Sequence, residues 1–385
     1  MVRELVRSTV RHVGAIFPGQ FESPAPRQEV VLVRPDHLGD AILSFPALRL
    51  LRSTAPRLRR TILTGPWNRE VFEHSGLAHE VVTLPFPGFT RSTRSHPIAP
   101  YRLLVQEAAR LRRRAPLAIV LLREDHWWGA WLGALAGIPI RIGADHPAVA
   151  RFLTHRLAHR SGHVAAVSIE LAAAALRLLG YDTRIPQPTP TDFPLFWPVD
   201  ASAAQRVRGL LDRRGARPPI AVIHPGSGAP AKCWPEARWA ALVDALEASG
   251  YTVVLTGSAD EKVVLQRITA WSRHTPLVVA GELTLRELAE LLRCASVVIG
   301  PDTGPLHLAT AVGTPTVHLF GPTSPDRFGP WGLAHRHRVL RAPDWCPRCG
   351  DIGADRPSGV GCMMALSVER VVDELRRLAF EGTPQ

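Results

Sequence analysis

Lysine is almost missing from this sequence, because only Lys232 and Lys262 among its 46 basic residues are lysines and the others are arginines. Long apolar runs are missing as well. No stretch of about 18 uncharged apolar residues occurs, which speaks against a membrane-spanning helix. The first residues, MVRELVRSTVRHVG, contain no apolar core of the length found in signal peptides. We therefore expect a cytoplasmic protein.

Cysteine is scarce, with five residues in 385, too few for a disulfide-stabilised scaffold. Three of the five lie close together: Cys346 and Cys349 form a C-x-x-C pair, and Cys362 follows. This spacing resembles part of a structural zinc site, although a fourth ligand is not evident. The alternative is a group of thiols packed in one loop, and the sequence leaves both interpretations open.

Acidic residues are fewer than basic ones, 34 against 46, which gives a formal charge of +12. Three partners explain such an excess: nucleic acid, an anionic membrane surface or a phosphorylated substrate. A general preference for arginine explains part of it equally well. No RRM, helix-turn-helix or zinc-finger pattern is present and the basic residues are dispersed, so we expect no nucleic-acid partner.

The length of 385 residues predicts two or three domains, and 46% hydrophobic with 21% charged residues is ordinary for a globular protein. Residues 1–27 form an N-terminal extension outside the pattern that follows. In residues 28–181, continuous apolar strands alternate with helices, which indicates a parallel sheet covered on both faces. The strands are expected at 29–34, 60–64, 80–84 and 117–123, with a helix at 41–53.

Residues 182–198 are rich in proline and predict a linker, after which a second alternation of strands and helices occupies residues 199–366. Its strands are expected at 220–224, 251–256, 276–279, 296–300 and 314–320, and its helices at 235–249, 259–271, 284–293 and 304–312. An amphipathic helix at 367–380, with Ser367 as its N-cap, closes the chain. The prediction is an α/β protein of two doubly wound domains that face each other across a cleft, with the ligand at the carboxyl ends of the strands.

The first polar motif, RPDHLGD, follows the first expected strand. Gly39 permits a tight turn into the helix, and Asp40 falls near the helix start. Asp40 is either an N-cap or a general base that faces the cleft, and Asp36 competes for the second role. After the fourth strand of this domain, Arg123, Glu124, Asp125 and His126 occupy the position of an acceptor site. Trp127 and Trp128 either stack on a sugar or fill the core.

The second motif, HPGSG, follows the first strand of the second domain. Its backbone N–H groups and the Ser227 hydroxyl, with Gly228 beside it, are suited to an anion. Lys232 follows at a distance that reaches the same anion, and the spacing differs from a Walker A loop. Because arginine is used almost everywhere else, a lysine here suggests that a compact ammonium is needed. The alternative is a solvated loop residue.

The third motif, VVIGPDTGPLHLA, is the most specific. A strand leads through Asp302, Thr303 and Gly304 into a helix that carries His307 one turn later. A helix start with small residues favours phosphate, so this segment fits a diphosphate site. The alternative is a capped helix with a partly buried histidine. An aspartic protease is a poor match, because only one Asp-Thr-Gly is present and the pattern is α/β.

These three motifs, in this order, resemble the bacterial glycosyltransferase family 9, whose best-known members are the ADP-heptose:lipopolysaccharide heptosyltransferases. The segments VLVRPDHLGDAILSFPALRLLR, IAVIHPGSGAPAKCWPEARWAALVDAL and LAELLRCASVVIGPDTGPLHLATAVGTPTVHLFGPTSP carry the resemblance, which extends over residues 29–380. It implies a GT-B fold, with the C-terminal helix packed back on the first domain. It also implies inverting transfer of a sugar from a nucleotide diphosphate donor, with no required metal or cofactor.

The resemblance assigns roles to individual residues. Asp40 matches the proposed catalytic base, and Lys232 matches a lysine that contacts donor phosphate or sugar. The donor-binding residues that it implies are Ser227, Gly228, Glu261, Asp302, Thr303, Gly304 and His307, with Glu261 at the ribose. Asp36 and Arg123 are candidates for binding the acceptor, a lipopolysaccharide-type or other surface glycan or glycolipid. Such an acceptor makes peripheral contact with the inner membrane an expectation too.

A second function remains compatible with the same fold, a non-catalytic protein that binds a sugar nucleotide or a glycan. The presence of Asp40, Lys232 and Asp302 together argues against it, because a decayed site would be free to lose them. A hydroxyl nucleophile needs a base and the leaving diphosphate needs positive partners, and these residues supply both.

Overall fold

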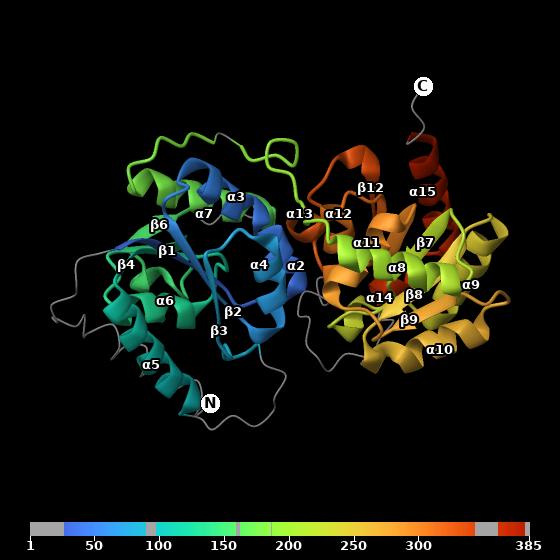
Figure 1. Cartoon of the computed structure of the whole chain (residues 1–385), viewed down its shortest axis with the longest axis horizontal. Coiled ribbons are helices and arrows are strands. Elements are labelled where there is room, and N and C mark those ends of the chain that lie inside the picture. The colour runs from blue at the N-terminus through green and yellow to red at the C-terminus, as the bar shows by residue number, and fades with distance from the viewer. Residues whose placement is uncertain (1–26, 90–97, 159–161, 186, 343–360, 382–385) are drawn as a thin grey trace. The chain divides into compact units, whose positions relative to one another are not determined.

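The computed structural model describes residues 27–89, 98–158, 162–185, 187–342 and 361–381. The chain divides into two compact units, residues 1–188 and 189–385. Each unit is a parallel six-stranded sheet with helices on both faces (Figure 1). The predicted pair of doubly wound α/β sheets is therefore confirmed. No helix in the described residues is long and apolar enough to cross a membrane.

The first sheet has the strand order β3-β2-β1-β4-β5-β6. Its strands are β1 (Arg27–Arg34), β2 (Arg59–Thr64), β3 (Glu80–Thr83), β4 (Pro116–Leu121), β5 (Ile140–Ala144) and β6 (His155–Leu157). Its α-helices are α2 (Leu38–Leu43), α3 (Phe45–Thr54), α4 (Arg69–Ser75), α5 (Ala99–Arg114), α6 (Trp127–Leu135) and α7 (Val164–Leu178). Helices α5 and α6 cover one face and α3 and α7 cover the other (Figure 1).

The second sheet repeats this arrangement with the order β9-β8-β7-β10-β11-β12. Its strands are β7 (Ile220–Ile223), β8 (Thr252–Gly257), β9 (Leu277–Ala280), β10 (Val297–Pro301), β11 (Thr316–Phe320) and β12 (His337–Arg341). Its α-helices are α8 (Ala201–Arg213), α9 (Glu236–Ala248), α10 (Lys262–Trp271), α11 (Leu285–Cys294), α12 (Gly304–Ala311), α13 (Pro325–Phe328), α14 (Gly361–Met364) and α15 (Val368–Glu381). Helices α9, α10 and α15 share one apolar core, and α8 packs on α11.

The strands are fully buried where the sequence is continuously apolar, as expected for parallel sheets covered on both faces. Val30 to Val33 of β1 are at most 1% exposed, and Val298 and Ile299 of β10 are not exposed at all. Tertiary packing therefore selects strands at these positions, and the strand ends that follow place polar loops along one edge of each sheet.

The helix expected at residues 41–53 is two helices. α2 ends at Leu43 and α3 begins at Phe45, with Ser44 between them. Pro46, at the start of α3, has no N–H group to continue the helix and favours the first turn of a new one. The break turns the short α2 into a separate element, which carries Asp40 in its first turn.

The proline-rich segment contributes to the second unit in its later part. Trp331 donates a hydrogen bond to the Phe193 carbonyl oxygen at 2.8 Å, and Arg293 donates to the Trp197 carbonyl oxygen at 3.1 Å. Trp197 itself is buried. Residues from 189 onward are therefore packed onto this unit.

Helix α15 begins after Ser367, whose hydroxyl oxygen accepts the Arg370 N–H at 3.4 Å, so Ser367 caps the helix as predicted. Its apolar face, including Val371 and Leu378, belongs to the core of the second unit. That face is thus covered within its own unit, and packing of the helix against the first domain stays a prediction.

Candidate active site

Each sheet has one position where the strand order reverses, and the predicted site residues lie at these positions. In the first unit these are the ends of the neighbouring strands β1 and β4, and in the second the ends of β7 and β10. Doubly wound sheets bind their ligands at this point, because the loops that follow the two strands diverge to opposite faces. The polar residues of RPDHLGD and of 123–126 therefore meet in one unit, and those of HPGSG and GPDTGPLH meet in the other.

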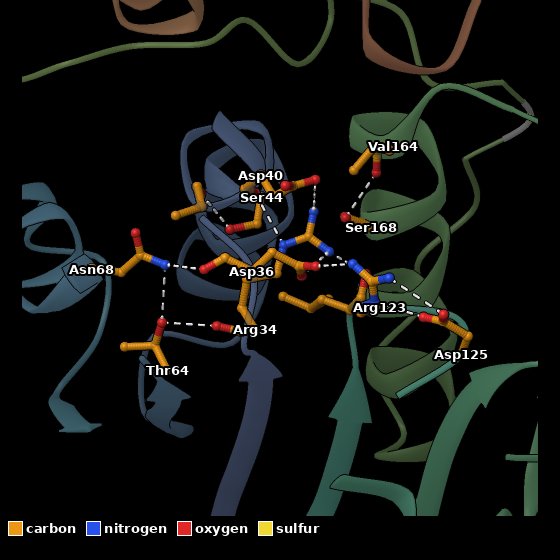
Figure 2. A network of polar contacts seen from close by, with 12 residues as sticks. Arg34, Asp36, Asp40, Ser44, Thr64, Asn68, Arg123, Asp125, Val164 and Ser168 are labelled. Atoms are coloured by element: carbon orange, nitrogen blue, oxygen red, sulfur yellow. Dashed lines mark hydrogen bonds and ion pairs between the residues drawn. The ribbon is translucent and has the colours of Figure 1, made fainter. Parts of the chain in front are cut away.

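Arg34 organises the site in the first unit (Figure 2). Its side chain is buried and donates hydrogen bonds to the carbonyl oxygens of Asp40, at 3.0 Å, and Leu122. It also approaches the carboxylates of Asp36 and Asp40, at 3.4 and 3.5 Å. One guanidinium thus ties the loop after β1, the start of α2 and the end of β4 together.

Asp36 and Arg123 form an ion pair across 87 residues of sequence, with Arg123 donating to Asp36 Oδ1. Arg123 also donates two hydrogen bonds to the Asp125 carboxylate, of 2.6 and 3.3 Å. Burial alone would lower the pKa of Arg123, but the two carboxylates outweigh it and raise the pKa above its usual value. Two carboxylates already occupy this guanidinium, so its position favours holding Asp36 in place over binding an anion from the acceptor.

Of the two carboxylates that Arg34 approaches, Asp40 is the one that solvent reaches more readily. Its side chain is 30% exposed, whereas that of Asp36 is only 3% exposed. Asp40 is the third residue of α2, and the N-cap position belongs to His37. The interpretation of Asp40 as an N-cap is therefore wrong, and Arg34 holds a carboxylate that is partly exposed to solvent.

Aromatic and polar side chains support the same loop. Trp67 and Asn68 both donate to the Asp36 carbonyl oxygen at 2.7 Å, which fixes the backbone of the loop. The exposed ring of His37 lies 5.4 Å from that of Trp67 and 6.4 Å from that of Phe89. Trp67 and Phe89 thus place aromatic rings next to the loop that precedes Asp40.

Trp128, in contrast, fills the core. It is 1% exposed and its indole nitrogen donates to the Pro100 carbonyl oxygen at 3.0 Å. Trp127 is half-buried and packs against Trp131, with the ring centres 6.2 Å apart. The structural interpretation therefore holds for Trp128.

Asp302 is the centre of the site in the second unit. Its side chain is 6% exposed, and its Oδ2 atom accepts hydrogen bonds from Lys232 Nζ at 2.7 Å and from the Thr323 hydroxyl at 2.8 Å. Its Oδ1 atom lies 3.5 Å from His307 Nε2. Lys232 also reaches the Asp302 carbonyl oxygen at 3.3 Å, and its side chain is 19% exposed.

These partners decide the charge of Asp302. Burial alone would raise its pKa, but His307 and Lys232 outweigh burial and hold the pKa of this carboxyl well below its usual range. Asp302 is consequently a buried anion that keeps the Lys232 ammonium in place. The ammonium sits at the edge of the site, between a buried carboxylate and solvent, where an anionic ligand can share it.

The loop after β7 lies against Glu261. A Cβ atom added to Gly226 would be 1.7 Å from Glu261 Oε1, so only glycine permits this approach. The other carboxylate oxygen, Oε2, accepts hydrogen bonds from the N–H and hydroxyl of Ser258. Glu261 thus combines a capping role with a place beside the loop that contains Ser227 and Gly228.

The start of α12 is built from small residues, as predicted. Thr303 is its N-cap and makes no side-chain capping hydrogen bond, and Gly304 is the first helical residue. The close packing behind this turn requires Gly300, where an added Cβ would lie 2.6 Å from the His224 carbonyl oxygen. The ends of β7 and β10 therefore approach each other closely enough for HPGSG and the α12 start to border one site.

Thr323 is the residue of this cluster that the sequence analysis missed. It lies 21 residues beyond Asp302, in the loop after β11, and reaches Asp302 only because β10 and β11 are neighbours. Arg34 was missed in the same way in the first unit. Its position at the end of an apolar strand, directly before the polar loop, was the available signal.

The cysteine cluster contributes no described site. Cys346 and Cys349 lie outside the described residues, and Cys362 is buried against the loop after β11. Within the part of the chain that the structure describes, no group of three or more histidine, cysteine, aspartate or glutamate side chains is arranged to hold a metal ion.

Known proteins resemble this chain over most of its length. The sequence model of glycosyltransferase family 9 (heptosyltransferase) matches residues 108–353. Lipooligosaccharide heptosyltransferase 2 of Haemophilus ducreyi is 23% identical over 91% of this chain and 99% of its own. Lipopolysaccharide heptosyltransferase 3 of Escherichia coli is 33% identical, over 55% of this chain and 62% of its own length.

Solved structures agree with the fold. The family 9 glycosyl transferase of Veillonella parvula superposes with a TM-score of 0.72 at 22% identity, covering 93% of this chain and 98% of that one. The ADP-heptose lipopolysaccharide heptosyltransferase II of Escherichia coli gives a TM-score of 0.69 at 23% identity, over 92% and 100% of the chains. The predicted GT-B fold is thereby confirmed. Together with the family match, these similarities show that the chain is a glycosyltransferase that belongs to family 9, the heptosyltransferase family.

Proposed function

We propose that this enzyme transfers heptose from ADP-heptose to a lipopolysaccharide-type acceptor. The named relatives support heptose and lipopolysaccharide, since the curated proteins that match are lipopolysaccharide and lipooligosaccharide heptosyltransferases. The observation that carries the proposal is the Lys232–Asp302 pair at the reversal point of the second sheet, with the start of α12 beside it. A nucleotide diphosphate needs such a cation and such N–H groups.

Donor binding is assigned to the second unit. Lys232 shares its ammonium with the diphosphate, and the loop with Ser227 and Gly228 lines the same anion together with Thr303 and Gly304. Asp302 holds Lys232 from behind and is itself contacted by His307. Glu261 binds the ribose through Oε1, the oxygen that does not accept from Ser258. The leaving diphosphate gains negative charge as the sugar departs. Lys232 and the helix start stabilise that charge, which supports a reaction with no required metal.

Activation of the acceptor is assigned to the first unit. Asp40 accepts the proton of the acceptor hydroxyl, whose oxygen forms the new bond to the sugar carbon while the bond to the diphosphate breaks. A single displacement inverts the configuration at that carbon. Arg34 supports this role by holding Asp40 in a fixed orientation, and Asp36 with Arg123 fixes the loop that precedes it. A carboxylate positioned as general base contributes about 100- to 10,000-fold in rate.

The site of action is proposed to be the cytoplasm, at the inner face of the cytoplasmic membrane. A lipid-anchored acceptor is presented there, and the formal charge of +12 favours an anionic lipid surface and phosphorylated acceptors.

A nucleotide-binding measurement tests the donor assignment. Thermal unfolding is followed for wild type and Lys232→Met with ADP, UDP, GDP, CDP and dTDP, each at saturating concentration. A ligand at about 100 times its dissociation constant stabilises the folded state by about 2.7 kcal/mol. We expect ADP to raise the unfolding temperature of wild type and not that of the variant. Stabilisation of both proteins to the same extent would place the nucleotide elsewhere.

A further inference from the structure

The Thr323 hydroxyl lies directly behind the proposed donor site. It is buried and donates to Asp302 Oδ2 at 2.8 Å, the same oxygen that accepts from Lys232 Nζ at 2.7 Å. Two donors therefore share one carboxylate oxygen: the Lys232 ammonium in the site and the Thr323 hydroxyl in the loop after β11. The direction of the Asp302 carboxylate, and with it the resting place of the Lys232 ammonium, depends on both.

The loop that carries Thr323 is rigidly supported. Residues 321–323 are buried, and a Cβ atom added to Gly321 would be 2.6 Å from the Met363 sulfur of α14. The strands β10 and β11 are paired in parallel register, and the Asp302 N–H donates to the Leu319 carbonyl oxygen at 3.2 Å. Thr323 thus meets Asp302 from a fixed backbone, as a positioning group must.

We propose that Thr323 is a positioning residue for donor binding, which holds Asp302 so that Lys232 presents its ammonium to the donor diphosphate. This inference rests on the proposed function of Lys232. Without the hydroxyl, one acceptor position of a buried anion is empty, and Lys232 is the nearest cation that can fill it. The ammonium is then drawn toward Asp302 and away from the ligand, which weakens donor binding.

Two substitutions separate the hydroxyl from the rest of the side chain. Thr323→Val keeps the shape and removes the hydrogen bond, whereas Thr323→Ser keeps the hydrogen bond and removes a methyl group. Thr310→Val is a matched control, because Thr310 is also buried and its hydroxyl donates to the Leu306 carbonyl oxygen inside α12. The measurement is the dissociation constant of ADP by titration calorimetry, for the full chain.

We expect Thr323→Val to weaken ADP binding about tenfold or more, the size of one hydrogen bond to a charged group. Thr323→Ser restores most of the affinity, and Thr310→Val leaves it unchanged. In a Lys232→Met background, Thr323→Val adds little, because the ammonium that it positions is gone. A structural role in packing gives the opposite order, with Thr323→Ser more harmful than Thr323→Val.

The outcomes separate the inference from the proposed function. If Lys232→Met weakens ADP binding but Thr323→Val does not, the inference on Thr323 is overturned and the donor site stands. If Lys232→Met and wild type bind ADP equally, or wild type does not bind it, both are overturned. If Thr323→Val does not fold, Thr323→Ala replaces it with the same expectations.

Discussion

Acid should destabilise the first unit through His126, a buried histidine close to Asp36 and Arg123. Its ring is packed against Phe86 and Phe89, with ring centres 5.2 and 5.7 Å away. Neither ring nitrogen has a hydrogen-bond partner among the described residues. The pKa of His126 is lowered to about 4, chiefly by burial; Asp36 and Asp125 act in the opposite direction, and Arg123 adds to the lowering.

The size of the effect follows from this pKa. In the unfolded chain a histidine titrates near pH 6.5, so between pH 6.5 and about 4 the unfolded state binds a proton that the folded state does not. The contribution of neutral His126 to the free energy of unfolding is fully present above pH 6.5. It decreases as the pH falls, and the loss is complete below about pH 4. At about 1.36 kcal/mol per pH unit, His126 costs about 2 kcal/mol on going to pH 5. For a unit of this size that corresponds to about 4–8 °C in unfolding temperature.

The test compares wild type with His126→Phe, which keeps an aromatic ring and cannot be protonated. Thermal unfolding is followed at pH 7.5 and pH 5. The variant should lose about 2 kcal/mol less than wild type over this interval. His155→Gln, at a partly exposed histidine of the same unit, should follow wild type. Equal losses for wild type and His126→Phe would refute the argument that His126 is held neutral by burial.

Two further substitutions each probe one close contact, the first in the second unit and the other in the first unit. Gly226→Ala places a methyl group 1.7 Å from Glu261 Oε1, so the carboxylate must move, and we expect a raised KM for the donor with little change in kcat, measured by steady-state kinetics. Arg114→Met leaves the buried Glu29 carboxylate without its ion-pair partner at 2.5 Å, and we expect a loss of about 3–5 kcal/mol in the free energy of unfolding, measured in urea. A loss below about 1 kcal/mol would show that solvent or Arg59 compensates.

Much of the fold was predictable from the sequence because continuous apolar strands leave little choice. Each strand expected in the two sheets is present within two residues of its predicted ends. The single helix expected at 41–53 is interrupted at Ser44, and Pro46 was the residue that could have predicted the interruption. Cys294, whose apolar sequence context predicts a core position, is instead exposed at the end of α11, because only one face of that helix is buried.

The candidate site residues could be named from the sequence motifs, but the contacts between them could not. The motifs pointed to Asp36, Arg123, Lys232 and Asp302, yet the contacts between them depend on which strands are neighbours. The ion pair of Asp36 with Arg123 requires β1 beside β4. The hydrogen bond from Thr323 likewise needs β10 beside β11, which spacing in the sequence does not express.

The roles that follow from these pairs differ from the motif-based ones. Arg123 has both of its carboxylate partners inside the protein, so it is better suited to holding Asp36 than to holding the acceptor. Asp302 is buried behind Lys232, so it is better suited to holding the ammonium than to touching the sugar. The first role comes from the ion pairs of Arg123 and the second from the burial of Asp302, and the sequence alone supplies neither.

The central claim is that Asp40 activates an acceptor for transfer from ADP-heptose, and the most direct test is acceptor-dependent release of ADP. Purified wild type and Asp40→Asn are supplied with ADP-heptose and a heptose-deficient lipopolysaccharide, and the affinity for ADP is measured in parallel. We predict that wild type releases ADP only with acceptor, and that Asp40→Asn is at least about 100-fold slower while it binds ADP as wild type does. An Asp40→Asn variant with the wild-type rate, or a wild type that binds ADP but never turns over, would contradict the account.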